Sequence, residues 1–321
     1  MSTAWYRLDL DKTYLATPLE HKLQLLRVPF ESPESKRTLS GMAALVRSLR
    51  EYAGTSRIER GHITILSASP DFLARQLRSK LELDGVHVDR FVFKDQWSLI
   101  RRGRFREISD PLGYKLHALC KLGGEVDPNG DVEILVGDDY DLDPLIYSLY
   151  AELRSGNASR DIAVTLFDRH DVRPQVRDEI FRFLDGLPPA DTVRAIFIRR
   201  DQRRDTAFYA AFGSRLRPYD DAFQLVLLLY DLRCVRREAV EAVVQELQQR
   251  RWRKAAFAYS WRALTVLNFL ERYAEIERLL GDMDLIPRRG FFERLTRRPP
   301  RPAAHRGVNW DQVLAWRAEE D

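Results

Sequence analysis

The fold of this chain is decided by Trp5-Tyr6-Arg7-Leu8-Asp9-Leu10-Asp11-Lys12-Thr13-Tyr14-Leu15. A short apolar run ends here in two aspartates, Asp9 and Asp11, and alternate residues of a strand point to the same side. Open α/β sheets bind ligands at the carboxyl ends of their strands. The pattern is typical either of a solvated acidic turn or of two carboxylates whose repulsion is offset by a metal ion or a shared proton.

Strand-like and helix-like segments alternate from residue 5 to about residue 200. After the first strand, strands are expected at 63–66, 90–94, 132–136, 162–167 and 193–198, with helices between them at 40–50, 71–83, 115–122, 144–153 and 175–184. This alternation predicts an α/β fold with a doubly wound parallel sheet. Beyond about residue 205 only helices are expected, at 223–232, 237–249 and 255–280.

Three regions follow from this pattern. Residues 1–204 are predicted to form the sheet domain, 205–287 an all-helical region, and 288–321 a basic tail rich in proline and arginine. Residues 16–60 begin with an irregular stretch, which the expected helix at 40–50 follows, and together they are expected to form a small cap or flap beside the first strand.

The composition is that of a globular protein with a substantial core. The chain has 321 residues, of which 45% are hydrophobic and 31% charged, as in ordinary soluble domains. Cys120 and Cys234 are far apart in the sequence, so we expect two buried thiols and neither a metal site nor a disulfide. Reduced thiols are typical of a cytoplasmic protein. We also expect neither a targeting segment nor a membrane span.

The charge balance permits an anionic partner. The net charge is +4 and the isoelectric point is about 9.0. No recognition motif accompanies the scattered basic residues, so nucleic acid is not expected. The basic tail is typical of a solvated segment, and peripheral contact with anionic lipid is the alternative. The oligomeric state is not specified by the sequence.

Polar residues follow several of the expected strands. Ser67 ends the second strand, where it caps a helix or faces a bound anion. Lys115 lies at a helix start, where the helix dipole disfavours a cation. Asp138 ends a further strand and is followed by Asp139, Asp141 and Asp143, which suit either a hydrated acidic loop or a divalent cation.

Taken in order, these positions resemble the four motifs of the haloacid dehalogenase superfamily of phosphatases, most closely its phosphatidate phosphatase domains. The resemblance covers residues 5 to 200. Lys12 stands where that family usually has an acid, and residues 155–192 resemble an insertion. Besides the first strand, the matching pieces are Leu66-Ser67-Ala68-Ser69-Pro70, Phe93-Lys94-Asp95-Gln96-Trp97, Gly113-Tyr114-Lys115-Leu116 and Gly137-Asp138 through Asp143-Pro144-Leu145-Ile146-Tyr147.

The resemblance implies a Mg²⁺-dependent phosphatase. Asp9 would form an aspartyl-phosphate, and Asp11 would act as proton donor and acceptor. Ser67 and Lys115 would hold the phosphoryl oxygens. The implied metal ligands are Asp9, Asp11, Asp138 and Asp143, and Asp139 is the alternative to Asp143. Thr13 would fix the turn that follows the first strand.

The implied substrate is a phosphomonoester, with a phosphatidate-like lipid phosphate as one candidate. A protein with the same fold could instead bind a phosphorylated lipid or protein without catalysis, and the sequence leaves this alternative open.

Overall fold

The computed structural model describes residues 2–16, 37–50, 58–70, 74–94, 110–287 and 306–315. Their strands form one six-stranded sheet in the order β3-β2-β1-β4-β5-β6, and each neighbouring pair is parallel. The predicted α/β class with a parallel sheet is therefore confirmed. The strands are β1 (Ser2–Leu8), β2 (Ile58–Pro70), β3 (Arg90–Lys94), β4 (Val132–Asp138), β5 (Val193–Arg199) and β6 (Leu216–Tyr219).

The strand order contains one reversal. The chain passes from β1 through β2 to β3 in one direction, and then returns to place β4, β5 and β6 on the other side of β1. Side chains at the carboxyl ends of β1 and β4 therefore flank the point where the two halves diverge. This is the position at which open α/β sheets bind their ligands.

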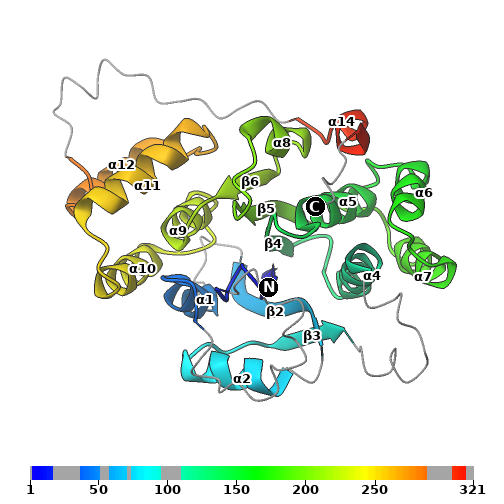
Figure 1. The fold of residues 1–321 in the computed structure, drawn as a ribbon, viewed down its shortest axis with the longest axis horizontal. Coiled ribbons are helices and arrows are strands. Elements are labelled where there is room, and N and C mark those ends of the chain that lie inside the picture. Colours follow the sequence, from blue (N-terminus) through cyan, green and yellow to red (C-terminus); the bar gives the residue numbers. More distant parts are fainter. Residues whose placement is uncertain are drawn as a thin grey trace.

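Helices cover both faces of the sheet. Figure 1 shows α1, α9 and α10 on one side, and α4, α5 and α7 on the other. The helices are α1 (Met42–Arg50), α2 (Ala74–Leu83), α4 (Pro111–Gly123), α5 (Asp143–Ser155), α6 (Arg160–Arg169), α7 (Pro174–Asp185), α8 (Thr206–Ala211), α9 (Ala222–Asp231), α10 (Arg237–Gln249), α11 (Lys254–Val266), α12 (Tyr273–Asp282) and α14 (Trp310–Ala315).

Alternate residues of each central strand enter different cores. In β4, Ile134 and Val136 belong to the core that includes buried residues of α1 and of the helices from α9 to α12. Leu135, between them, belongs to the core on the opposite face, which includes buried residues of α4, α5 and α7. A parallel sheet covered on both faces needs apolar side chains on both, which explains the nearly continuous hydrophobic run of this strand.

The strand expected at 162–167 is wrong, because this segment belongs to helix α6. Ser159 caps the helix by accepting a hydrogen bond from the Ile162 amide. Ala163, Leu166 and Phe167 are buried, and this spacing marks one face of a helix. The apolar run is as short as a strand, but its buried positions follow the helical period.

The expectation that only helices follow residue 205 is also wrong. Strand β6 pairs with β5 and forms an edge of the sheet, so the sheet extends past the predicted boundary at 204. The strand has four residues and includes Pro218. Proline is tolerated at a sheet edge because its missing amide leaves no ladder bond broken.

The helix expected at 255–280 is two helices, α11 and α12. Asn268 lies between them with φ of 56°, in the left-handed region that no α-helix continues through. The buried carboxylate of Asp231 accepts hydrogen bonds from the amides of Glu271 and Arg272. This carboxylate fixes the chain where the second helix begins.

Other expected boundaries move by a few residues. Pro70 belongs to β2 and does not open a helix, and the helix carrying Lys115 begins at Pro111. Part of the predicted tail, Trp310–Ala315, is the helix α14. The expected cap falls partly on residues 17–36 and 51–57, which lie outside the described residues, as do residues 95–109 and 288–305.

Candidate active site

Three aspartates meet at the reversal of the sheet. Asp9 directly follows β1, Asp138 is the last residue of β4, and Asp143 is the first residue of α5. The Asp9 amide donates a 2.8 Å hydrogen bond to the Val136 carbonyl, which ties the end of β1 to β4. One carboxylate oxygen from each aspartate lies within 4.8 Å of the others, and all three side chains are buried. We call these residues the carboxylate cluster.

Lys115 supplies positive charge to the carboxylate cluster. It lies early in α4, a helix capped by Asp110, whose carboxylate accepts the Gly113 amide at 2.7 Å. The Lys115 Nζ atom lies 2.8 Å from Asp9 Oδ1 and 2.5 Å from Asp143 Oδ1. Its side chain is 1% exposed. The ammonium group is therefore held between two carboxylates and away from solvent.

Burial is the main cause of the raised pKa values of the three acids. Burial is the main cause of the raised pKa of Asp9, and Lys115 opposes it. Burial, followed by the neighbouring Asp143, raises the pKa of Asp138 to about 7. Burial also raises the pKa of Asp143. In each case the surrounding protein does not fully replace the hydration that the charged carboxylate loses on burial.

The pKa of Lys115 is shifted in the sense that keeps it charged. Burial by itself would lower this pKa, but the carboxylates of Asp143 and Asp9 outweigh burial and the pKa is raised. Lys115 is therefore an ammonium group across the neutral pH range, because its pKa lies above the ordinary value for lysine.

The carboxylate cluster fits a metal ion. Lys115 contacts two of the three carboxylates, and none of the described residues donates a hydrogen bond to the buried Asp143 Oδ2 atom. Asp138 receives hydrogen bonds from the Thr13 hydroxyl at 3.2 Å and the Tyr140 amide at 2.8 Å. Hard divalent cations bind such carboxylate oxygens. A cation here would offset the burial that raises all three pKa values and the repulsion between carboxylates that adds to it at Asp9 and Asp138.

Gly137 makes room for Asp143 beside the sheet. A Cβ atom at Gly137 would lie 2.3 Å from Asp143 Oδ2 and 2.8 Å from a ring carbon of Tyr147. Both distances are well below van der Waals contact. A side chain at position 137 would therefore displace the Asp143 carboxylate from the cluster.

The remaining predicted residues have different surroundings. Asp11 is partly exposed and is not a member of the carboxylate cluster, although its charge raises the pKa of Asp9. Ser67 is fully buried in β2, and its carbonyl accepts a 3.1 Å hydrogen bond from the Tyr114 hydroxyl.

Asp139, the rival of Asp143, has another set of partners. Its carboxylate accepts hydrogen bonds from the amides of Asp201 and Gln202 and from the Tyr209 hydroxyl. The structure thus brings Asp143, and not Asp139, together with Asp9 and Asp138.

Sequence reasoning missed a role for Tyr147. Its hydroxyl is buried without a hydrogen-bond partner among the described residues. Burial, then the charge of Asp143, raises its pKa. Residues four apart lie on one face of a helix, so the spacing of Asp143 and Tyr147 on α5 could have indicated that both face the site.

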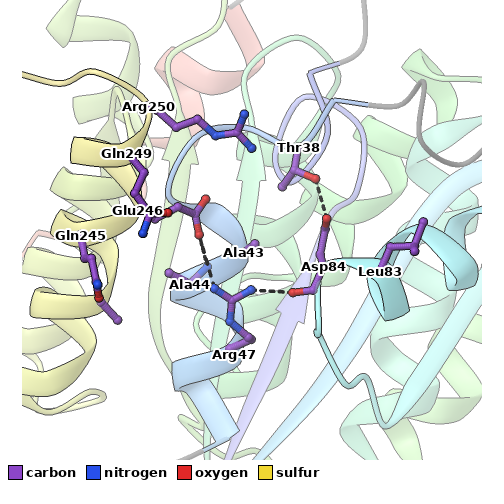
Figure 2. A pocket seen from close by; sticks show the side chains of 11 residues that line it. Thr38, Ala43, Ala44, Arg47, Leu83, Asp84, Gln245, Glu246, Gln249 and Arg250 are labelled. Carbon is purple, nitrogen blue, oxygen red and sulfur yellow. Dashed lines mark hydrogen bonds and ion pairs between the residues drawn. The ribbon is translucent and has the colours of Figure 1, made fainter.

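A hollow that is lined by none of the predicted site residues lies elsewhere in the fold. It encloses about 560 Å³ between α1, α10 and the end of α2. Figure 2 shows Arg47 between Glu246 and Asp84, with Thr38 on the far side of Asp84. Glu246 also accepts the amides of Gly41 and Ala44 at the start of α1. These charged groups tie the three helices together.

Comparisons of the chain with protein-family models, with curated proteins and with solved structures give no match. Within the part of the chain that the structure describes, each helix is too short or too polar to cross a bilayer.

Proposed function

We propose that this protein is a Mg²⁺-dependent phosphatase that hydrolyses a phosphomonoester through an aspartyl-phosphate. The observation that carries the proposal is the contact of Asp9 with Lys115, at 2.8 Å, within the carboxylate cluster at the reversal of the sheet. A carboxylate at a strand end, held by a buried cation beside further acids, suits nucleophilic attack on phosphorus.

Asp9 is the proposed nucleophile. Its carboxylate oxygen attacks phosphorus, and the bond from phosphorus to the ester oxygen breaks. Asp11 gives a proton to the departing oxygen and then takes a proton from the water that hydrolyses the aspartyl-phosphate. The products are the alcohol, inorganic phosphate and the restored carboxylate of Asp9. The partial exposure of Asp11 suits a group that meets substrate and water.

Lys115 and Ser67 are the proposed phosphoryl-binding groups. Lys115 keeps its charge because the neighbouring carboxylates raise its pKa, and a fixed ammonium group stabilises negative charge that develops on the phosphoryl oxygens. Ser67 lies on β2, the strand next to β1, so its end of the strand is adjacent to Asp9. The residues of the carboxylate cluster would hold Mg²⁺, which supplies positive charge to the phosphoryl group when bound.

The test is release of phosphate from 4-nitrophenyl phosphate with and without Mg²⁺. Asp9→Asn keeps the size of the side chain and removes the nucleophile, so turnover should be abolished. Asp127→Asn is the matched control, because Asp127 is exposed in the turn before β4. It should retain turnover and the unfolding midpoint of the parent protein.

A phosphoryl group trapped on the protein would locate the nucleophile. Rapid acid quenching followed by mass spectrometry should find it on the peptide containing Asp9, and hydroxylamine should remove it. Absence of turnover on a panel of phosphomonoesters that includes a lipid phosphate, despite Mg²⁺ binding, would reject the phosphatase in favour of a binding protein.

A further inference from the structure

Lys12 has an unusual backbone conformation directly after Asp11. Its φ is 56°, in the left-handed region that residues other than glycine rarely adopt. The residue is 8% exposed. A conformation of this kind persists only where surrounding contacts hold it.

Two loops of the sheet supply those contacts. Lys12 Nζ lies 2.9 Å from Asp201 Oδ2 and 3.1 Å from the ring centroid of Tyr140. The Lys12 carbonyl accepts a hydrogen bond from Arg199 Nε. Tyr140 follows β4, whereas Arg199 and Asp201 lie at and just after the end of β5. Residues at the ends of β4 and β5 therefore hold both the backbone and the side chain of Lys12 in place.

The loop that holds Lys12 is itself fixed. Asp139 accepts hydrogen bonds from the amides of Asp201 and Gln202, at 2.7 Å and 2.9 Å, and from the Tyr209 hydroxyl at 2.5 Å. Arg199 also forms an ion pair with Asp201. The loop that carries Asp201 is therefore held by several hydrogen bonds and an ion pair in addition to its contact with Lys12.

The Lys12–Asp201 pair is shielded from solvent. The two side chains are 10% and 22% exposed, so their attraction is screened less than that of a surface pair. The pair joins the end of β5 to the turn that follows β1. Since β1 and β5 lie on opposite sides of β4, it spans the carboxyl edge where the carboxylate cluster is formed.

We infer that the Lys12–Asp201 ion pair is a positioning device, which fixes the turn after β1 so that Asp11 is directed at the leaving group. This inference rests on the proposed function. A proton donor must come within hydrogen-bond distance of the ester oxygen, and an ångström of misplacement can cost about 100-fold in rate. Lys12 and Asp201 act through Asp11 and do not touch substrate.

The leaving group provides a specific test. A 4-nitrophenolate ion leaves readily without a proton, whereas an alkoxide requires one. Asp201→Asn removes the charge that holds Lys12, so it should slow phosphorylation of the enzyme by an alkyl phosphate about 10-fold more than by 4-nitrophenyl phosphate. Both rates are measured in single turnovers with Mg²⁺ present, and KM should stay within about 2-fold of the parent value because phosphate binding is untouched.

Two further variants separate positioning from folding. Asp201→Glu keeps the negative charge and should restore most of the lost rate with the alkyl phosphate. Asp191→Asn is the matched control, since Asp191 pairs with Arg215 near the amino end of β5 and is 64% exposed. It should leave both rates unchanged.

The outcomes separate this inference from the proposed function. If the parent protein turns over both esters but Asp201→Asn slows them equally, or slows neither, the positioning role is wrong and the phosphatase stands. If the parent protein turns over none of the phosphomonoesters on the panel, the proposed function fails and the positioning role fails with it.

Discussion

The Lys115 Nζ atom lies 2.8 Å from Asp9 Oδ1, although 106 positions separate the two residues in the chain. The contact forms because α4 packs against the sheet beside β2 and α5, which brings an early residue of the helix to the end of β1. Both side chains are buried. A buried ion pair of this kind leaves an uncompensated charge when one partner is removed.

Replacement of Lys115 by methionine should destabilise the protein. Lys115→Met keeps the length of the side chain and removes the ammonium group that contacts the buried carboxylates of Asp9 and Asp143. We expect the free energy of unfolding to fall by about 3–5 kcal/mol, measured by urea denaturation in the presence of a chelator. Lys121→Met is the control, because Lys121 is exposed on the same helix. Equal losses for the two variants would contradict the structural importance of the ammonium group.

Gly137→Ala should disrupt the carboxylate cluster. The new methyl group would lie 2.3 Å from Asp143 Oδ2, so the Asp143 side chain must move. We expect a loss of about 1–3 kcal/mol in the free energy of unfolding, together with loss of the stabilisation that we expect Mg²⁺ to give the parent protein. Gly130→Ala is the control, because a Cβ atom there would meet nothing closer than 3.8 Å. Undiminished Mg²⁺ stabilisation in Gly137→Ala would exclude Asp143 as a ligand.

The central strands and the order of the site residues could be predicted from the sequence because their signals are local. Strong apolar runs such as 132–136 indicate a buried strand, and parallel strands bring their carboxyl ends to one edge. The sequence alone therefore predicts that Asp9 and Asp138 lie together at that edge. The alternative of a solvated acidic turn is excluded for Asp9 by its 5% exposure.

The remaining features depend on contacts that a single sequence does not encode. Asp139 and Asp143 are chemically identical, and only the packing of α5 directs Asp143 to the cluster while the loop after β5 occupies Asp139. Strand β6 has only four residues and includes a proline, so its sequence carries little signal for a strand. It forms a strand because it pairs with β5. Lys12 carries no local signal, because its partner Asp201 lies 189 positions away.

Asp84 should make stability depend on acid pH. Partial burial alone would raise its pKa, but hydrogen bonds from Lys80, Thr38 and Tyr14 outweigh burial, and the pKa of Asp84 is lowered. A carboxyl group with a lowered folded pKa stabilises the fold above its unfolded pKa, which is about 3.9. This contribution is lost as the pH falls through the folded value.

Asp84→Asn should therefore destabilise the protein at neutral pH, and the deficit relative to the parent should shrink below about pH 4. Urea denaturation at the two pH values measures this difference. Asp127→Asn serves as the control, since Asp127 is exposed in the turn before β4 and should cause little change at either pH. If Asp84→Asn lowered the free energy of unfolding by the same amount at both pH values, the hydrogen bonds from the three donors would not depend on the charge of the Asp84 carboxylate.

Tyr147→Phe should leave the metal-free protein as stable as the parent or more so. The Tyr147 hydroxyl is buried without a hydrogen-bond partner among the described residues, so its removal relieves a desolvated group, and we expect a gain of up to about 1 kcal/mol in the free energy of unfolding. Tyr150→Phe on the same helix is the matched contrast. The Tyr150 hydroxyl donates to Glu133 Oε1 at 2.9 Å, so its loss should cost about 1–3 kcal/mol. If Tyr147→Phe destabilised the protein as much as Tyr150→Phe, the hydroxyl of Tyr147 would have to be satisfied in solution by a bound water or ion at the carboxylate cluster.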